Sequence, residues 1–242
     1  GIYAGSRGET VNINGGIISG NRATNGGGIY ASSGAKFHLN GGEIQKNVAT
    51  EAGGGVYCSR LYSQNTGRCE FYGGTISGNS KQGGSGGVFL VGTTNQTNPP
   101  SFTMHGGTIS NNTAGASDGG GGGVYVGEKC SFTMDGGTIT KNTASSTDGG
   151  VGVYTSTSTA TFTMNGGTIS GNTATKGGGV GVYRAATFNM SGTASITNNT
   201  ANQGGGVHVK GAFTMNNSAS VTGNTATNNG GGVYVEGGTF TM

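Results

Sequence analysis

The sequence predicts an all-β fold, a right-handed parallel β-helix (solenoid) of about eight coils with three short strands in each coil. One repeated unit of roughly 25 to 35 residues covers the whole chain. Apolar residues recur at fixed positions of that unit with the alternation of a strand. Glycine supplies 56 of the 242 residues and is clustered between the apolar positions. Residues 1–242 are therefore expected to form a single continuous β-helix domain.

The unit opens with a strand in which a polar column, mostly threonine or asparagine, separates two apolar columns. Side chains that point in, out and in again have the period of a strand rather than of a helix. The first apolar column holds Val11, Phe37, Cys69, Phe102, Phe132, Phe162, Phe188, Phe213 and Phe240, and the second holds Ile13, Leu39, Phe71, Met104, Met134, Met164, Met190, Met215 and Met242.

Two further strands and an asparagine column complete the unit. The asparagines are interpreted as structural, because an Asn side chain tolerates a left-handed corner and bonds the backbone of a neighbouring coil. The second strand is centred on Ile18, Ile44, Ile76, Ile109, Ile139, Ile169, Ile196 and Val221. The asparagine column is Asn21, Asn47, Asn79, Asn112, Asn142, Asn172, Asn199 and Asn224. The third strand is predicted to begin at Ile29, Val56, Val88, Val124, Val153, Val182, Val207 and Val233.

One unit cannot bury its own apolar face, so successive units must stack on one another. Parallel stacking sets equivalent residues about 4.8 Å apart and builds ladders of Phe, Met and Ile. Positive φ at tight corners explains the glycines. Helical repeats conflict with Gly-Gly-Gly beside β-branched residues, and a propeller blade needs four strands. An antiparallel meander is the alternative that the pattern leaves open.

The composition and charge of the chain exclude several classes of partner and of fold. The formal charge is only +3 and no run of Lys or Arg occurs, so neither nucleic acid nor an anionic membrane is an expected partner. Two prolines are too few for collagen, and apolar residues in register argue against disorder. No stretch approaches about 20 apolar residues, so no transmembrane segment is expected in this chain.

Residues 166–174 read Gly-Gly-Thr-Ile-Ser-Gly-Asn-Thr-Ala and are followed by Gly-Gly-Gly-Val at 177–180. This repeat resembles those of bacterial surface proteins, and it is similar to the Gly-Gly-Ala-Ile and Phe-x-x-Asn repeats of polymorphic outer-membrane autotransporters. The resemblance covers the whole chain. It implies an adhesin-like β-helix that is extracellular or on a bacterial cell surface, with no catalytic residues to carry over.

Both ends of the sequence interrupt a repeat, since residues 1–4 match the tail of a unit and Thr241-Met242 end inside a strand. End coils of solenoids need caps. The chain is therefore expected to be a segment of a longer repeat protein or assembly, a stalk or filament piece. Its expected partners are further repeats or other copies of the same protein, and a host glycan or protein ligand.

A column of ring side chains follows the first residue of the third strand. Its members are Tyr or Phe except for His208. Alternation with inward valines predicts that these rings face solvent, where they could contact sugars or a protein. The alternative interpretation is that stacked rings only support one another between coils. The predicted binding face is Tyr30, Tyr57, Phe89, Tyr125, Tyr154, Tyr183 and Tyr234.

Ionisable residues give only fragments of a catalytic or metal site. His105 and Asp135 hold the same position in adjacent coils, about 5 Å apart, and an acid beside a histidine is a candidate base. Asp118 and Asp148 precede adjacent glycine corners and are weak candidates for sharing a cation. Because neither pair belongs to a converging cluster, the sequence predicts no catalytic residue, no metal site and no cofactor.

Cys58 and Cys69 bracket a loop and are a candidate disulfide in an oxidising compartment. The alternative is that both, like Cys130, are reduced core residues. The function expected from all these features is non-enzymatic, a structural or adhesin-like surface module that presents a repetitive binding face. The alternative function is a polysaccharide-active β-helix enzyme, a lyase or a hydrolase.

Overall fold

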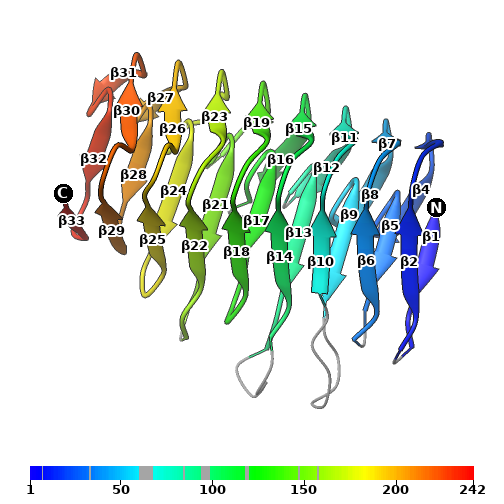
Figure 1. Cartoon of the computed structure of the whole chain (residues 1–242). Helices are drawn as coiled ribbons and strands as arrows, with labels where there is room; N and C mark the ends of the chain where they lie inside the picture. Colours follow the sequence, from blue (N-terminus) through cyan, green and yellow to red (C-terminus); the bar gives the residue numbers. More distant parts are fainter. Residues whose placement is uncertain are drawn as a thin grey trace.

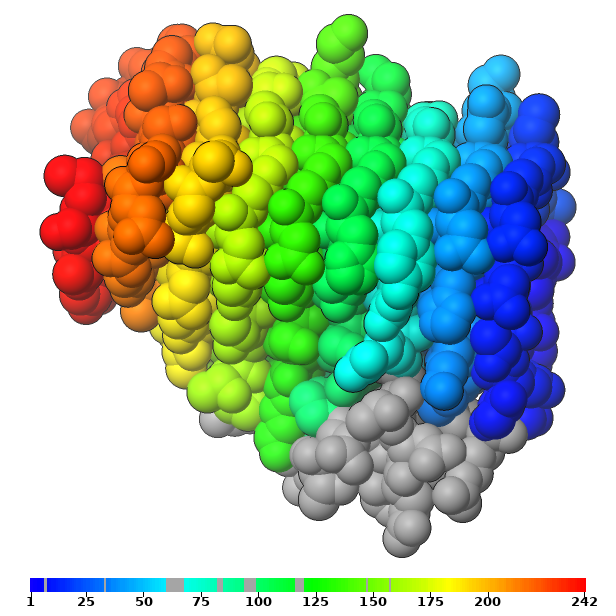
Figure 2. Space-filling view, in the orientation of Figure 1, coloured from blue at the N-terminus to red at the C-terminus, as the bar shows by residue number. Residues whose placement is uncertain are grey.

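A computed structural model shows the chain as a parallel β-helix whose coils lie side by side from the N-terminus to the C-terminus (Figure 1). The structure describes residues 1–6, 8–32, 34–59, 68–83, 85–93, 99–117, 120–146, 148–156 and 158–242. Each coil forms one slab of the space-filling surface, with the next coil packed directly against it (Figure 2). The predicted fold class is confirmed, and the antiparallel meander is excluded because the described strand pairs are parallel.

The largest sheets, which we call sheet A and sheet B, each contain nine strands. Sheet A contains β1 (Ile2–Ala4), β5 (Ile29–Ala31), β9 (Val56–Ser59), β13 (Val88–Val91), β17 (Val124–Val126), β21 (Val151–Tyr154), β24 (Val180–Tyr183), β28 (Val207–Val209) and β32 (Val233–Val235). Sheet B contains β2 (Thr10–Ile13), β6 (Lys36–Leu39), β10 (Arg68–Phe71), β14 (Ser101–Met104), β18 (Ser131–Met134), β22 (Thr161–Met164), β25 (Thr187–Met190), β29 (Ala212–Met215) and β33 (Thr239–Thr241).

Sheet C follows sheet B in every coil and contains the isoleucine column. Its eight strands are β3 (Ile17–Ser19), β7 (Glu43–Gln45), β11 (Thr75–Ser77), β15 (Thr108–Ser110), β19 (Thr138–Thr140), β23 (Thr168–Ser170), β26 (Ser195–Thr197) and β30 (Ser220–Thr222).

A fourth short strand follows the asparagine in most coils, where the sequence predicted only three strands. It forms one five-stranded and one two-stranded sheet, and isolated bridges at Thr173 connect the two. The polar, small residues of this segment carry no strong strand pattern, so the backbone ladder alone reveals it. These strands are β4 (Arg22–Asn25), β8 (Val48–Ala52), β12 (Ser80–Gly83), β16 (Thr113–Ser117), β20 (Thr143–Ala144), β27 (Thr200–Gln203) and β31 (Thr225–Asn229).

The core consists of ladders that run along the axis of the solenoid. Inward Phe rings of sheet B stack on one another, and Phe132, Phe162 and Phe188 lie 4.7 Å apart between ring centroids. Met164 and Ile169 belong to the parallel ladders of Met and Ile, and neither side chain is exposed to solvent. Because each ring contacts its equivalent in both neighbouring coils, burial depends on stacking rather than on any single coil.

The glycine triplet before sheet A is required by close backbone approach. Gly177 has φ 56°, and a Cβ there would lie 2.5 Å from the carbonyl oxygen of Val180. A Cβ on Gly179 would lie 2.7 Å from Cγ2 of Ile196 in the next coil. The first glycine thus supplies the corner, and the third lets adjacent coils meet.

The start of the third strand was predicted wrongly in two coils. The strands β21 and β24 begin at Val151 and Val180, two residues before the predicted Val153 and Val182. Val124 pairs with Val151, and Val126 pairs with Val153. The extra Val-Gly pair therefore moves the following tyrosine two residues along the strand.

Candidate functional site

The outer face of sheet A carries a run of stacked rings in its N-terminal half. Ring centroids of consecutive members lie 4.6 to 5.7 Å apart, with interplanar angles of 7 to 14°. Ring faces inside the run are therefore covered by neighbouring rings. Tyr3 is 73% exposed, the other four rings are half-buried, and burial raises the pKa of Tyr57 and Tyr125. This packing is the mutual support between coils that the sequence left open as an alternative. We call Tyr3, Tyr30, Tyr57, Phe89 and Tyr125 the aromatic run.

The predicted column is interrupted after Tyr125, which corrects the assignment of Tyr154 and Tyr183 to it. Tyr125 pairs with Gly152, and Gly152 pairs with Gly181. Tyr154 and Tyr183 pair with each other one outward position further along. The column resumes at His208 and Tyr234, whose rings are tilted by 37° rather than stacked.

Asp148 fills the gap that the two glycines leave. Its carboxyl lies so close to Gly181 that a Cβ there would be 1.8 Å from Oδ1, and a Cβ on Gly152 would be 2.8 Å from Oδ2. The Tyr183 hydroxyl donates a 2.9 Å hydrogen bond to Oδ1. Asp148 is only 2% exposed, and burial raises its pKa well above the usual value, against the opposing effects of Tyr183 and the Lys176 charge.

An ion-pair network lies beyond this gap, on the C-terminal coils. Glu236 contacts His208 Nε2 at 2.9 Å, Lys210 Nζ at 3.1 Å and Lys176 Nζ at 3.3 Å. The hydrogen bond from His208, with those from the lysines, lowers the pKa of Glu236 to about 2 although burial opposes it. Burial of the imidazole lowers the pKa of His208, although the hydrogen bond with Glu236 opposes this shift.

Sequence reasoning missed this network, which we call the Glu236 network. Lys210 and Glu236 share one position of the unit in adjacent coils, so alignment could have found that pair, but Lys176 and His208 hold other positions. Lys176 precedes a glycine corner, His208 lies in the ring column, and Lys210 and Glu236 follow strands β28 and β32. Chemically, the network favours the ionised form of Glu236, and burial disfavours the charged form of His208. Nδ1 of His208 is buried without a hydrogen-bond partner among the described residues.

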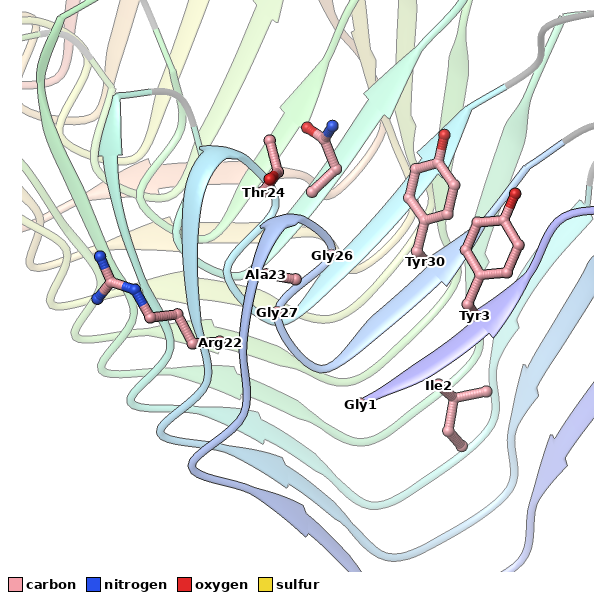
Figure 3. Close-up of a pocket in the computed structure, with 10 residues that line it drawn as sticks. Gly1, Ile2, Tyr3, Arg22, Ala23, Thr24, Gly26, Gly27 and Tyr30 are labelled. Atoms are coloured by element: carbon pink, nitrogen blue, oxygen red, sulfur yellow. The ribbon is translucent and has the colours of Figure 1, made fainter.

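A pocket of about 430 Å³ lies at the first coil, between Tyr3 and Tyr30 on one side and the strand β4 on the other (Figure 3). Arg22 and Thr24 come from β4, which is the end strand of its sheet. The inner strands of that sheet have a neighbouring strand on the side where β4 has none. Because a coil would fill the equivalent space elsewhere in the stack, we assign no ligand to this pocket.

The outer face of sheet B brings together His105 and Asp135, as their shared position in adjacent coils predicted. Nδ1 of His105 lies 3.5 Å from Oδ2 of Asp135, and their side chains are 39% and 42% exposed. The His105 ring stacks on Tyr72 at 4.7 Å, and Asn165 donates a hydrogen bond to Asp135. The pair is thus an exposed contact in a row of mixed polar residues.

The predicted asparagine column forms a continuous hydrogen-bonded ladder. Oδ1 of Asn142 accepts from both the backbone N and Nδ2 of Asn112, and Nδ2 of Asn142 donates to Asn172 Oδ1 and to the Ile109 carbonyl. The left-handed corner expected at the asparagine belongs to the residue before it, such as Lys141 with φ 55°. The asparagines therefore bond between coils, and their neighbours turn the chain.

Cys58 and Cys69 are joined in a disulfide, with an S–S distance of 2.14 Å, and link sheet A to sheet B. Both are 2% exposed. Cys130 is a free, buried thiol, and burial raises its pKa.

Of the weak metal candidates, Asp118 lies outside the described residues, and the register neighbour of Asp148 is Gly121. No metal-binding group of three His, Cys, Asp or Glu occurs within the described ranges.

Comparison with known proteins identifies the family. The family model described as the right handed beta helix region matches residues 61–242. The chain belongs to this family. No curated protein and no solved structure matches this β-helix. Within the part that the structure describes, no helix has the length and apolar character to span a bilayer.

Proposed function

We propose that this β-helix is a non-enzymatic structural module, extracellular or on a bacterial cell surface, that serves as an adhesin-like stalk or filament segment. The observation that carries the proposal is the in-register stack of coils, fixed by the asparagine ladder and the Phe stack. Such a stack is stiff and presents the same groups at intervals of about 4.8 Å. Further repeats or other copies of the chain are its proposed axial partners.

The disulfide and the aromatic run support the proposed location and contacts. A disulfide persists in an oxidising compartment, outside the reducing cytosol. The aromatic run offers a strip of ring edges about five coils long to a glycan or protein. Its covered ring faces favour edge contacts and hydrogen bonds over stacking of a sugar on each ring.

Surface labelling of the source cells tests the location. An antibody against this β-helix is expected to label intact cells as strongly as permeabilised ones. Labelling that requires permeabilisation would refute the surface proposal. The double variant Tyr30→Ser/Tyr57→Ser tests binding through sheet A and should weaken binding to the glycan or protein ligand. The control variant Thr133→Ser/Thr163→Ser, at outward positions of sheet B, should leave that binding unchanged.

A polysaccharide-active enzyme is the second candidate, and one observation favours it. Asp148 is a carboxyl whose pKa burial raises, next to Tyr183 and near the Glu236 network, and general acids of glycoside-cleaving enzymes are carboxyls with raised pKa. The test is release of reducing ends or of unsaturated uronates from a panel of polysaccharides. Product that disappears in Asp148→Asn would replace the non-enzymatic proposal, and the absence of product with every polymer would remove this candidate.

A further inference from the structure

The outer face of sheet B carries a pocket of about 370 Å³, lined by Lys36, His38, Arg68 and Glu70. We call it the charged pocket. Lys36 and His38 alternate with buried residues of β6, and Arg68 and Glu70 alternate with buried residues of β10. All four side chains therefore point outward from two adjacent coils.

Two cations face each other across these strands. Phe37 pairs with Cys69, so the residues before them, Lys36 and Arg68, are neighbours at the strand spacing of about 4.8 Å. Lys36 is exposed, and the Arg68 side chain is 61% exposed. Like charges at facing positions repel, and an anion between them would relieve that repulsion.

Glu70 lines the pocket and pairs with Arg68. Its Oε1 lies 3.6 Å from Nη1 of Arg68, its Oε2 accepts the Tyr72 hydroxyl, and only 13% of its side chain is exposed. A guanidinium carries five N–H donors, and the contact with Glu70 involves one of its nitrogens. The fork geometry of Arg suits carboxylate and similar oxyanions.

Tyr72 adds an apolar surface beside these charges. It is 49% exposed, and one face of its ring stacks on His105 at 4.7 Å, where the contact with Asp135 holds the imidazole. Its neighbour on the other side is Asn40, because the Tyr72 amide bonds the carbonyl of Leu39. On the side of β6, the register neighbour of Tyr72 is thus a small polar residue rather than another ring, and the charged pocket lies on that side.

We propose that the charged pocket and Tyr72 bind an anionic polysaccharide that lies across the axis of the β-helix, along strands β6 and β10. Lys36 and Arg68 contact its carboxylate or sulfate groups, and the Tyr72 ring packs against a sugar. The site lies on sheet B, so it does not depend on the contacts proposed for sheet A, and it holds whether the protein is a surface module or not.

Affinity electrophoresis of the whole chain tests this proposal, with gels that contain polygalacturonate, dextran sulfate or neutral dextran. The chain is expected to be retarded by at least one charged polymer and not by dextran. Retardation by polygalacturonate assigns the site to carboxylates, and retardation by dextran sulfate alone assigns it to sulfates. No retardation by either polymer would overturn the proposal.

Matched variants separate a site from general charge. Lys36→Gln/Arg68→Gln is expected to raise Kd by on the order of tenfold or more, the loss expected for two charged hydrogen bonds. Lys46→Gln/Lys141→Gln removes the same net charge from exposed corners and should leave Kd unchanged. Tyr72→Ala should also weaken binding. Equal losses in both double variants, with circular dichroism showing both folded, would overturn the assignment.

Discussion

Replacing Asn142 with alanine should destabilise the β-helix far more than a typical buried polar substitution. The side chain takes part in four hydrogen bonds that connect three coils. Its loss leaves the backbone N–H of Asn112 and one Nδ2 hydrogen of Asn112 without an acceptor, in a site with no solvent exposure. Each orphaned buried donor costs about 1 to 3 kcal/mol, so the expected loss is about 4 kcal/mol.

Asn21→Ala is the matched control in the first described coil. The Asn21 side chain donates to Asn47 Oδ1 and to the Ser19 carbonyl, and it is partly exposed. Asn47 Oδ1 still accepts from the Asn21 backbone N–H after the substitution. Because no buried donor is orphaned, the expected loss is about 1 kcal/mol or less.

Urea unfolding followed by circular dichroism and tyrosine fluorescence measures both losses, since the chain contains no tryptophan to dominate the emission. Hydrogen exchange at the Asn112 amide gives a second, local readout: exchange should accelerate in Asn142→Ala and remain slow in Asn21→Ala. Equal destabilisation of the two variants, or a loss below about 1 kcal/mol for Asn142→Ala, would refute the inter-coil reasoning.

Three further predictions concern packing and charge. Phe162→Ala should cost about 3 to 5 kcal/mol in urea unfolding, because its ring is fully buried between two stacked rings; a smaller loss would mean that the stack collapses onto the cavity. Gly181→Ala should lower Tm sharply because its Cβ would meet the Asp148 carboxyl, and Asp148→Gly should restore Tm in the double variant; no rescue would place the clash elsewhere. Asp148→Asn should become more stable relative to the parent as pH rises from about 4 to 7. The raised pKa of Asp148 in the folded state means that the unfolded chain releases this proton more readily, which destabilises the parent by about 1.4 kcal/mol per unit of pKa difference. Parallel curves of Tm against pH for the two proteins would contradict a raised pKa at Asp148.

The fold was predictable because every coil repeats the same pattern of burial. The Phe, Met, Ile and Asn columns identified in the sequence lie in register in the structure. The strand start in β21 and β24 could not be obtained in the same way. In Val-Gly-Val-Tyr, a shift of two residues leaves the inward and outward parity unchanged, so alternation cannot distinguish Val151 from Val153. The number of residues that follow the glycine corner distinguishes Val151 from Val153 as the start of the strand.

The candidate sites were less predictable, because they depend on neighbours between coils rather than on columns. His105 and Asp135 share one position of the unit, so their contact followed from alignment alone. Asp148 and Tyr183 occupy different positions, and their contact requires two coils that both lack an outward side chain at the ring column. Glycine at the ring column in two adjacent coils cannot be recognised from the sequence of one repeat alone.

The pair Gly152 and Gly181 also marks one position along the axis of the molecule. A perfectly translational rod would offer a bound polymer the same energy at every step of one coil, so the polymer could slide freely among equivalent positions. Here neutral stacked rings occupy one stretch of sheet A, and the ion pairs of Glu236 occupy the other, with Asp148 between them. A ligand that spans this boundary therefore has one preferred offset along the axis.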